Sequence, residues 1–347
     1  MVNRREFLQA TAAAGVGIAA ADLVHAAPSA AVPTKVQIPE ADKIVITVIT
    51  DNATDINRQD YKIAKRPTYL TYPLDAAVHA EHGLSYHVEA VVDGKSHSCL
   101  YDFGTDARGV LRNMDLLKIN LRQVEALGLS HDHWDHQFAL VDILKAKRSE
   151  FAAELPLYVG EQFFVGTYGT GPTGVVAKLN LLEKKDIEAL GFVKIVEVKG
   201  PTAIIPGAYL PGRVEQVVDY EKISPRFLAK RGNEYVQETF PGEQILILNA
   251  KGKGLVILSS CAHRGIVNSV KQAQRMTGIE KVHALIGGFH LINAKPELIL
   301  KTVADIKAIN PDYIVPTHCT GYEAIATFAR EMPENFILNT AGTRYVV

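Results

Sequence analysis

The segment Ser130 to His136 constrains this chain more than any other stretch of its 347 residues. It reads Ser-His-Asp-His-Trp-Asp-His, so three histidines and two aspartates fall within six residues. His131 and His133 are two apart, and in an extended loop their rings project the same way. Asp135 and His136 follow where the next helix is expected to begin. The segment can therefore present two pairs of ligands to two adjacent metal ions. Neutral imidazole and carboxylate suit zinc, and also iron or manganese when oxygen ligands join them.

The rest of the chain predicts a mixed order of strands and helices. β-Branched or alternating apolar runs predict strands, and apolar residues at helical spacing predict helices. The predicted strands are 43–50, 84–92, 98–102, 155–159, 244–249, 254–259, 282–286 and 313–316. The predicted helices are 138–152, 266–277 and 296–309. Each of the last strands ends close to a histidine or a cysteine.

Residues 160–243 differ from the flanking sequence, because glycines and prolines are scattered among short amphipathic pieces. Such a stretch is too long for an ordinary connection inside a compact domain. We interpret it as a cap-like insertion over the site. The predicted organisation is an export signal at 1–26, a linker at 27–40 and one domain at 41–347 that carries the insertion.

The N-terminus resembles a twin-arginine signal peptide. Arg4 and Arg5 precede a weakly apolar run from Ala10 to Ala21, and small residues before Ala27 suit a signal peptidase. This pattern predicts recognition by the twin-arginine export machinery and a periplasmic or otherwise exported mature protein. The alternative is a membrane anchor. The apolar run is well short of the ~20 residues that a spanning helix needs, so no stable anchor is expected after processing.

Composition excludes several other classes of protein. The chain is 47% hydrophobic and 22% charged, which is typical of a globular protein with a sizeable core. Lys and Arg number 37 against 38 Asp and Glu, so no basic field favours nucleic acid as a partner. The chain has three cysteines, Cys99, Cys261 and Cys319. A small, odd number of cysteines cannot form a disulfide framework.

With the pattern His-x-His-x-Asp-His at residues 131–136, the chain resembles the metallo-β-lactamase superfamily. Four segments resemble, in order, the branch named after dihydropterin-ribofuranosylaminobenzene phosphate synthases: Ser-His-x-His-Trp-Asp-His at 130–136, Cys-Ala-His-Arg-Gly-Ile-Val-Asn at 261–268, Gly-Gly-Phe-His-Leu at 287–291 and His-Cys-Thr-Gly at 318–321. The resemblance implies an α/β (α+β) fold, a four-layer αββα sandwich of mixed sheets with helices outside. It also implies a metal site at one edge of the sheets.

The resemblance further implies which residues hold the ions. His131 and His133 are expected at the first ion. Asp135 and His136 are expected at the second ion, where His318 takes the place of the superfamily's last histidine. These five side chains form the expected core of a binuclear centre.

One ligand of the first ion is missing from its usual place. Most superfamily members supply a histidine before a β-hairpin and a bridging aspartate after it, and here neither 238–243 nor 259–263 supplies that pair. We therefore predict His263 as the ligand and keep Cys261 as a thiolate candidate.

Four more residues are candidates for the site. His290 follows a buried strand and two glycines, where the backbone can approach a ligand closely, and is predicted to be catalytic. His82 belongs either to a loop surface or to the site wall, and Asn52 either contacts the substrate or ends a strand in a plain turn. Asp102 occupies a place where the superfamily often has an aspartate that orients a ligand histidine, with direct metal contact as the alternative.

These features predict an enzyme, a binuclear metallohydrolase. Two divalent ions, zinc or else iron or manganese, would share a water as hydroxide and polarise the substrate oxygen. Asp135 would accept a proton, and His290 would stabilise negative charge. The expected small-molecule substrate is a phosphoester, a lactone or a similar ester.

Two other functions stay open at this point. The branch name implies a pterin-related synthase that forms a C–N or C–C bond. Export counts against this function, because reduced pterin precursors are cytoplasmic metabolites. A metal-binding protein without catalysis is the third hypothesis.

Overall fold

The computed structural model describes residues 35–68, 76–171 and 173–347. The predicted export signal and the linker as far as residue 34 lie outside the described residues. The last part of the predicted linker packs on the domain, since the Val36 N–H donates to the Met276 carbonyl at 2.8 Å and Ile38 is buried. Within the described ranges, no helix is both long enough and apolar enough to span a bilayer.

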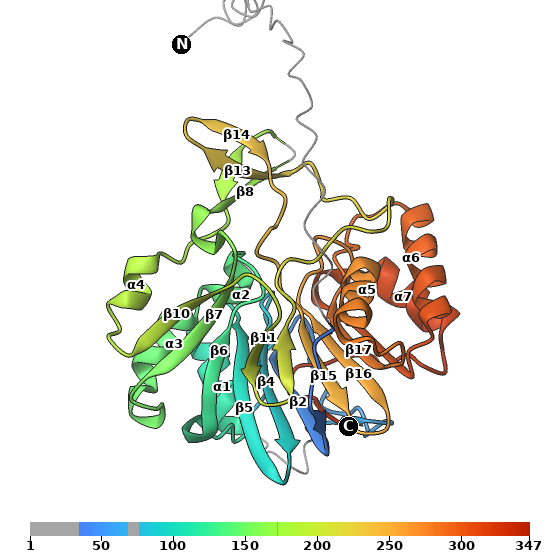
Figure 1. Cartoon of the computed structure of the whole chain (residues 1–347), viewed down its shortest axis with the longest axis horizontal. Helices are drawn as coiled ribbons and strands as arrows, with labels where there is room; N and C mark the ends of the chain where they lie inside the picture. The colour runs from blue at the N-terminus through green and yellow to red at the C-terminus, as the bar shows by residue number, and fades with distance from the viewer. Residues whose placement is uncertain (1–34, 69–75, 172) are drawn as a thin grey trace, which may run out of the picture. The chain divides into compact units, whose positions relative to one another are not determined.

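The first sheet has eight strands in the order β10-β7-β6-β5-β4-β2-β19-β3 (Figure 1). Their bounds are β2 Lys43–Thr50, β3 Ala64–Lys65, β4 Ser85–Val92, β5 Lys95–Phe103, β6 Val124–Gly128, β7 Leu155–Gly160, β10 Val193–Val198 and β19 Arg344–Val346. β2, β4 and β5 are antiparallel neighbours, and β6 and β7 run parallel to β5. The β4–β5 turn at Asp93 and Gly94 has φ values of 50° and 72°, which the Asp-Gly pair adopts at low cost.

The second sheet has seven strands, in the order β11-β12-β15-β16-β17-β18 with β1 beside β15. Their bounds are β1 Glu40–Ala41, β11 Thr202–Ile205, β12 Ala208–Leu210, β15 Leu246–Ala250, β16 Gly254–Ser259, β17 Val282–Gly288 and β18 Tyr313–Thr317. β15 and β16 form the predicted hairpin, whereas β16, β17 and β18 are parallel and are joined through helices.

Helices cover the outer face of each sheet (Figure 1). Beside the first sheet lie α1 Ala107–Leu116, α2 Trp134–Gln137, α3 Leu140–Ala146 and α4 Lys184–Glu188. Beside the second lie α5 Ile266–Thr277, α6 Pro296–Ile309 and α7 Tyr322–Glu331. Fully buried side chains such as Ile46, Tyr86, Leu248 and Ile286 fill the space between the sheets, and each large one contributes roughly 1.5–3 kcal/mol. Two further cores lie under the helices, so the predicted αββα order is confirmed.

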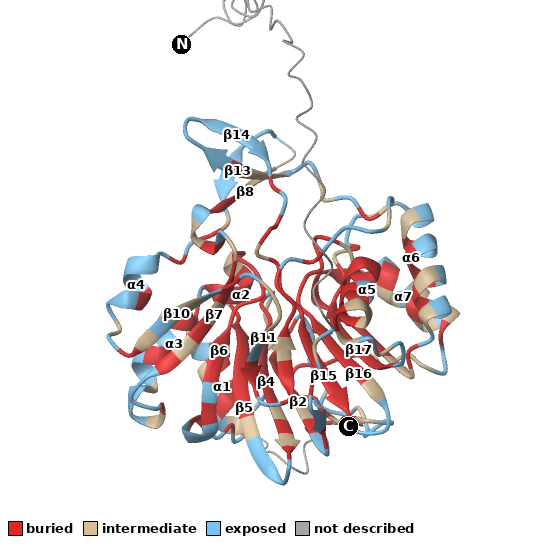
Figure 2. Ribbon diagram, viewed as in Figure 1, coloured by how far each residue is buried: buried red, intermediate tan, exposed pale blue. Residues whose placement is uncertain are grey.

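The predicted insertion at 160–243 divides between two structures. Its middle part supplies α4, β10, β11 and β12. This part belongs to the main layers, because β10 pairs with β7 in the first sheet and β12 pairs with β15 in the second. Its two flanks form a separate four-stranded sheet, which we call the small sheet, in the order β14-β13-β8-β9. The small sheet comprises β8 Thr167–Thr170, β9 Val176–Lys178, β13 Phe227–Arg231 and β14 Glu234–Gln237, and β13 and β14 are largely exposed (Figure 2).

The carboxyl ends of six strands lie at the same edge. In the first sheet β2, β5 and β6 run in one direction, and in the second sheet β16, β17 and β18 run parallel to one another. The segments that follow these strand ends contain all the predicted site residues except His82, which precedes β4, and Asp102, which lies within β5. Carboxyl ends of parallel strands commonly form the binding edge of a sheet.

Candidate metal centre

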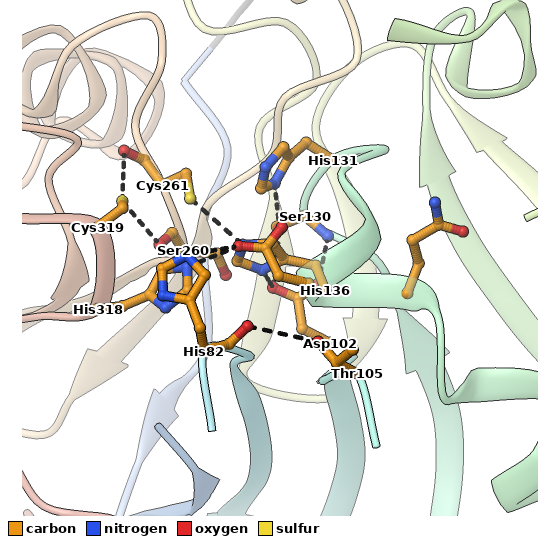
Figure 3. Close-up of polar contacts among 12 residues, drawn as sticks. His82, Asp102, Thr105, Ser130, His131, His136, Ser260, Cys261, His318 and Cys319 are labelled. Atoms are coloured by element: carbon orange, nitrogen blue, oxygen red, sulfur yellow. Dashed lines mark hydrogen bonds and ion pairs between the residues drawn. The ribbon is translucent and has the colours of Figure 1, made fainter. Parts of the chain in front are cut away.

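Asp102 fixes the histidine-rich loop from below (Figure 3). Its fully buried carboxylate accepts hydrogen bonds from the Ser130 N–H at 2.8 Å, the Ser130 hydroxyl at 2.7 Å and His136 Nδ1 at 2.8 Å. Because His136 donates from Nδ1, its Nε2 carries the lone pair and faces the site. Asp102 therefore holds the tautomer and orientation of His136.

His131, His133 and His263 form the first ligand group. Their candidate ligand atoms lie within 4.8 Å of one another, and His131 Nε2 is 3.3 Å from His263 Nε2. Burial lowers the pKa of His133 to about 3 and the pKa values of His131 and His263 well below their usual range. All three rings are thus neutral, which is the form that binds a metal.

The second group consists of Asp135, His136, His318 and Cys261. Asp135 Oδ2 is 3.3 Å from His318 Nε2 and 3.7 Å from His136 Nε2, and Cys261 Sγ is 3.3 Å from His136 Nε2. Burial would raise the pKa of Asp135, but the neighbouring histidines hold it well below its usual range. Burial and the neighbouring Cys319 thiol raise the pKa of Cys261.

The spacing of these atoms fits divalent cations. Nitrogen or oxygen ligands at 2.0–2.1 Å from a tetrahedral zinc ion lie about 3.3–3.4 Å from one another, and a thiolate lies slightly farther away. The 3.3 Å pairs His131–His263, His318–Asp135 and His136–Cys261 match these edges. His131 Nε2 and His263 Nε2 are also close enough for one neutral ring to donate a hydrogen bond to the other.

Glu243 was not predicted from the sequence, and it supports the turn that carries His263. Its carboxylate accepts the backbone N–H groups of His263 at 2.5 Å and Arg264 at 2.8 Å. Ala262 within this turn has φ 53°. In the sequence, the only sign of this role is an acidic residue directly before an apolar strand. The fold shows that its carboxylate binds the backbone N–H groups of His263 and Arg264.

Cys319 also joins the site without having been predicted. Its Sγ lies within 4.8 Å of the candidate ligand atoms of Cys261 and His318. The missing side chain of Gly288 makes this possible, since a Cβ there would lie 2.7 Å from Cys319 Sγ. The two thiols therefore meet across the glycine that ends the intervening strand.

Left-handed backbone is concentrated at this edge. Asp102, His290 and His318 have φ values of 58°, 47° and 51°, which cost on the order of 1–3 kcal/mol each. His290 packs against the His263 ring at 4.1 Å between centroids, and its buried Nδ1 has no hydrogen-bond partner. The structure thus brings His290 beside the first ligand group, where a catalytic role was predicted.

Asn52 and His82 lie on the far side of the second group. Asn52 Nδ2 donates to the His318 carbonyl at 3.0 Å, and its Oδ1 is 3.1 Å from His82 Nδ1. Each polar atom of Asn52 thus makes one contact within the protein. His82 Nε2 is 3.5 Å from Asp135 Oδ2.

A cavity of about 570 Å³ borders the first ligand group. His263 and His290 line it, and Phe227 of the small sheet contacts both rings. Lys222 and Arg226 line another part of its wall. Residues of the small sheet therefore form one wall of a pocket that reaches the candidate ligand His263.

The sandwich and the histidine-rich loop at its strand ends define the metallo-β-lactamase fold. A crystal structure of Tm1679, a metal-dependent hydrolase of the β-lactamase superfamily, has this fold: the TM-score is 0.66 at 22% identity, over 87% of this chain and 98% of that one. No protein-family model matches the chain.

The nearer relatives are proteins of Methanocaldococcus jannaschii. The chain is 35% identical over 266 residues to its 7,8-dihydropterin-6-methyl-4-(β-D-ribofuranosyl)-aminobenzene-5'-phosphate synthase, over 76% of this chain and 89% of that protein. It is 25% identical over 271 residues to an uncharacterized protein of the same organism, over 76% and 92% of the two chains. The chain belongs to the metallo-β-lactamase superfamily, in the family of this synthase.

Proposed function

We propose that this protein is an exported hydrolase that binds two divalent metal ions, preferably zinc, and cleaves a small ester. One observation carries the proposal: buried histidines, an aspartate and a cysteine converge with the spacing of metal ligands, and His263 among them lines a cavity of about 570 Å³. His131, His133 and His263 would hold one ion. Asp135, His136, His318 and Cys261 would hold the other.

Divalent ions at such a site supply Lewis acidity and lower the pKa of water, which is the chemistry that ester hydrolysis requires. The chain's own groups prepare the site for it. Asp102 presents His136 in one tautomer, and Glu243 fixes the turn that presents His263. Asp135, held ionised, would accept a proton, and His290 at the cavity wall would hydrogen-bond the oxygen that gains negative charge.

The cavity wall favours a substrate with an anionic part and an apolar part. Lys222 and Arg226 are exposed cations on the wall, whereas Phe227, Phe289 and Leu298 supply apolar surface. A phosphoester satisfies both conditions better than a neutral lactone does.

The test uses the mature protein from residue 27, purified without chelator. We expect close to two transition-metal ions per chain by elemental analysis and chelator-sensitive hydrolysis of at least one member of a chromogenic panel of phosphoesters, esters and lactones. His133→Ala should lose much of the metal and the activity. One ion or none in the wild type, or hydrolysis that chelator does not affect, would refute the proposal.

A synthase is the second candidate, because the 35% identical relative carries that name. Mass spectrometry distinguishes the two. Incubation with a dihydropterin and a ribofuranosylaminobenzene phosphate would yield the joined product if the chain is a synthase, and no such product if it is only a hydrolase. The predicted export signal favours the hydrolase.

A further inference from the structure

We propose that His82 is an additional metal ligand, which joins Asp135 and His318 at the second ion from the solvent side. The inference rests on the metal centre proposed above but assigns a residue outside its ligand set. The geometry that points to it is the convergence of His82 Nε2, Asp135 Oδ2 and His318 Nε2 within 4.8 Å of one another. Figure 3 shows the His82 and His318 rings side by side.

The hydrogen bonds of Asn52 determine which nitrogen of His82 faces the site. The His318 carbonyl can only accept, so the amide nitrogen of Asn52 must face it, at 3.0 Å. The amide oxygen then faces His82 Nδ1 at 3.1 Å and requires a proton there. In the neutral ring, the lone pair of His82 is therefore on Nε2, which points at Asp135.

The contacts of Nε2 have the spacing of a ligand set. Nε2 lies 3.5 Å from Asp135 Oδ2, and the same oxygen lies 3.3 Å from His318 Nε2. With His82 the second ion would have five protein ligands, and neighbouring ligands of a five-coordinate ion at 2.0–2.1 Å lie about 2.8–3.6 Å apart, so one cation can contact all three atoms. The His82 and His318 rings stack with centroids 4.9 Å apart at 18°.

The loop around His82 is held on both sides, although the side chain is 52% exposed. Glu81 accepts the N–H groups of Thr105 and Asp106 at 2.8 Å each, and its own N–H donates to the Asp51 carbonyl. On the other side, the Leu84 N–H donates to the Asp135 carbonyl at 3.1 Å. Holding an exposed side chain in one position costs conformational entropy, and a metal bond would offset that cost.

The experiment compares His82→Ala and His82→Gln with His79→Ala, a control on the same loop whose ring packs against α1 at Gly109. Metal affinity is measured by competition with a chromogenic chelator, and the visible d–d absorption of the Co²⁺-loaded protein reports the ligand set. We expect both His82 variants to bind one of two ions at least ~10-fold more weakly and to shift the Co²⁺ spectrum. The control should match the wild type.

Wild-type affinity and an unchanged Co²⁺ spectrum in both His82 variants would overturn the inference and leave the metal centre intact. A wild type that binds no transition metal would instead overturn the proposed function, and the inference with it. Because His82 is half exposed, both variants should keep the wild-type thermal midpoint without metal, which excludes misfolding as the cause of a loss.

Discussion

Replacing Asp102 by asparagine tests whether this buried carboxylate determines the ligand state of His136. The carboxylate accepts three hydrogen bonds, two from Ser130 and one from His136 Nδ1. An asparagine can keep the Ser130 N–H bond through its oxygen, but its NH₂ group then meets His136 Nδ1 as a second donor. His136 must move its proton to Nε2, and Nε2 then has no lone pair for a metal.

The size of the effect follows from these contacts. Loss of a group that orients a ligand histidine costs 10–100-fold in metal affinity, which corresponds to about 1.4–2.7 kcal/mol. The mismatched donor at a fully buried position adds roughly 1–3 kcal/mol of destabilisation to the metal-free protein. We expect the larger loss of affinity at the ion held by His136, because Asp102 contacts His136 directly and reaches His131 only through the Ser130 hydroxyl.

The assay measures both dissociation constants by chelator competition, with urea unfolding of the metal-free protein as the stability readout. Asp132→Asn is the matched control, because Asp132 is a buried carboxylate of the same loop that accepts hydrogen bonds from Thr167 and bonds no histidine. We expect the control to keep both metal affinities. Wild-type affinity at both ions in folded Asp102→Asn would refute the tautomer argument.

Three further predictions follow from the chain. His263→Ala should cost more metal and activity than Cys261→Ser, with at least ~100-fold loss of activity; metal retained in His263→Ala but lost in Cys261→Ser would reverse the two roles. His87 is buried and neither ring nitrogen has a hydrogen bond, with Nδ1 3.7 Å from Glu89 Oε2. Burial lowers its pKa from 6.5 to about 4, so only the unfolded chain gains a proton as pH falls through this window. Wild-type stability should therefore fall by up to about 3 kcal/mol between pH 6.5 and 4, less so in His87→Leu, and parallel urea-unfolding profiles would contradict this. Arg4→Lys combined with Arg5→Lys should leave unprocessed precursor in the cytoplasm, whereas normal periplasmic accumulation in a fractionation assay would count against export by this route.

The sequence by itself determined the elements whose signals are local. The β-branched run 43–50 is β2 and 266–277 is α5, each with the predicted bounds, and the Asp93-Gly94 pair forms the β4–β5 turn. The histidine-rich loop was recognisable for the same reason, because its ligand spacing lies within one short segment. These signals depend on neighbours along the chain, and such neighbours are visible in the sequence.

Only the tertiary structure decided how distant residues combine. Residues 184–210 carried glycine and proline signals of an insertion, but pairing with β7 and β15 places their strands in the main sheets. The approach of Cys319 to Cys261 depends on the bare Gly288 between them, and the position of His82 depends on Asn52, 30 residues earlier. Parallel strands bring these side chains to one edge of the sheets. The register of the pairing between distant strands determines this arrangement, and that register leaves no local pattern in the sequence.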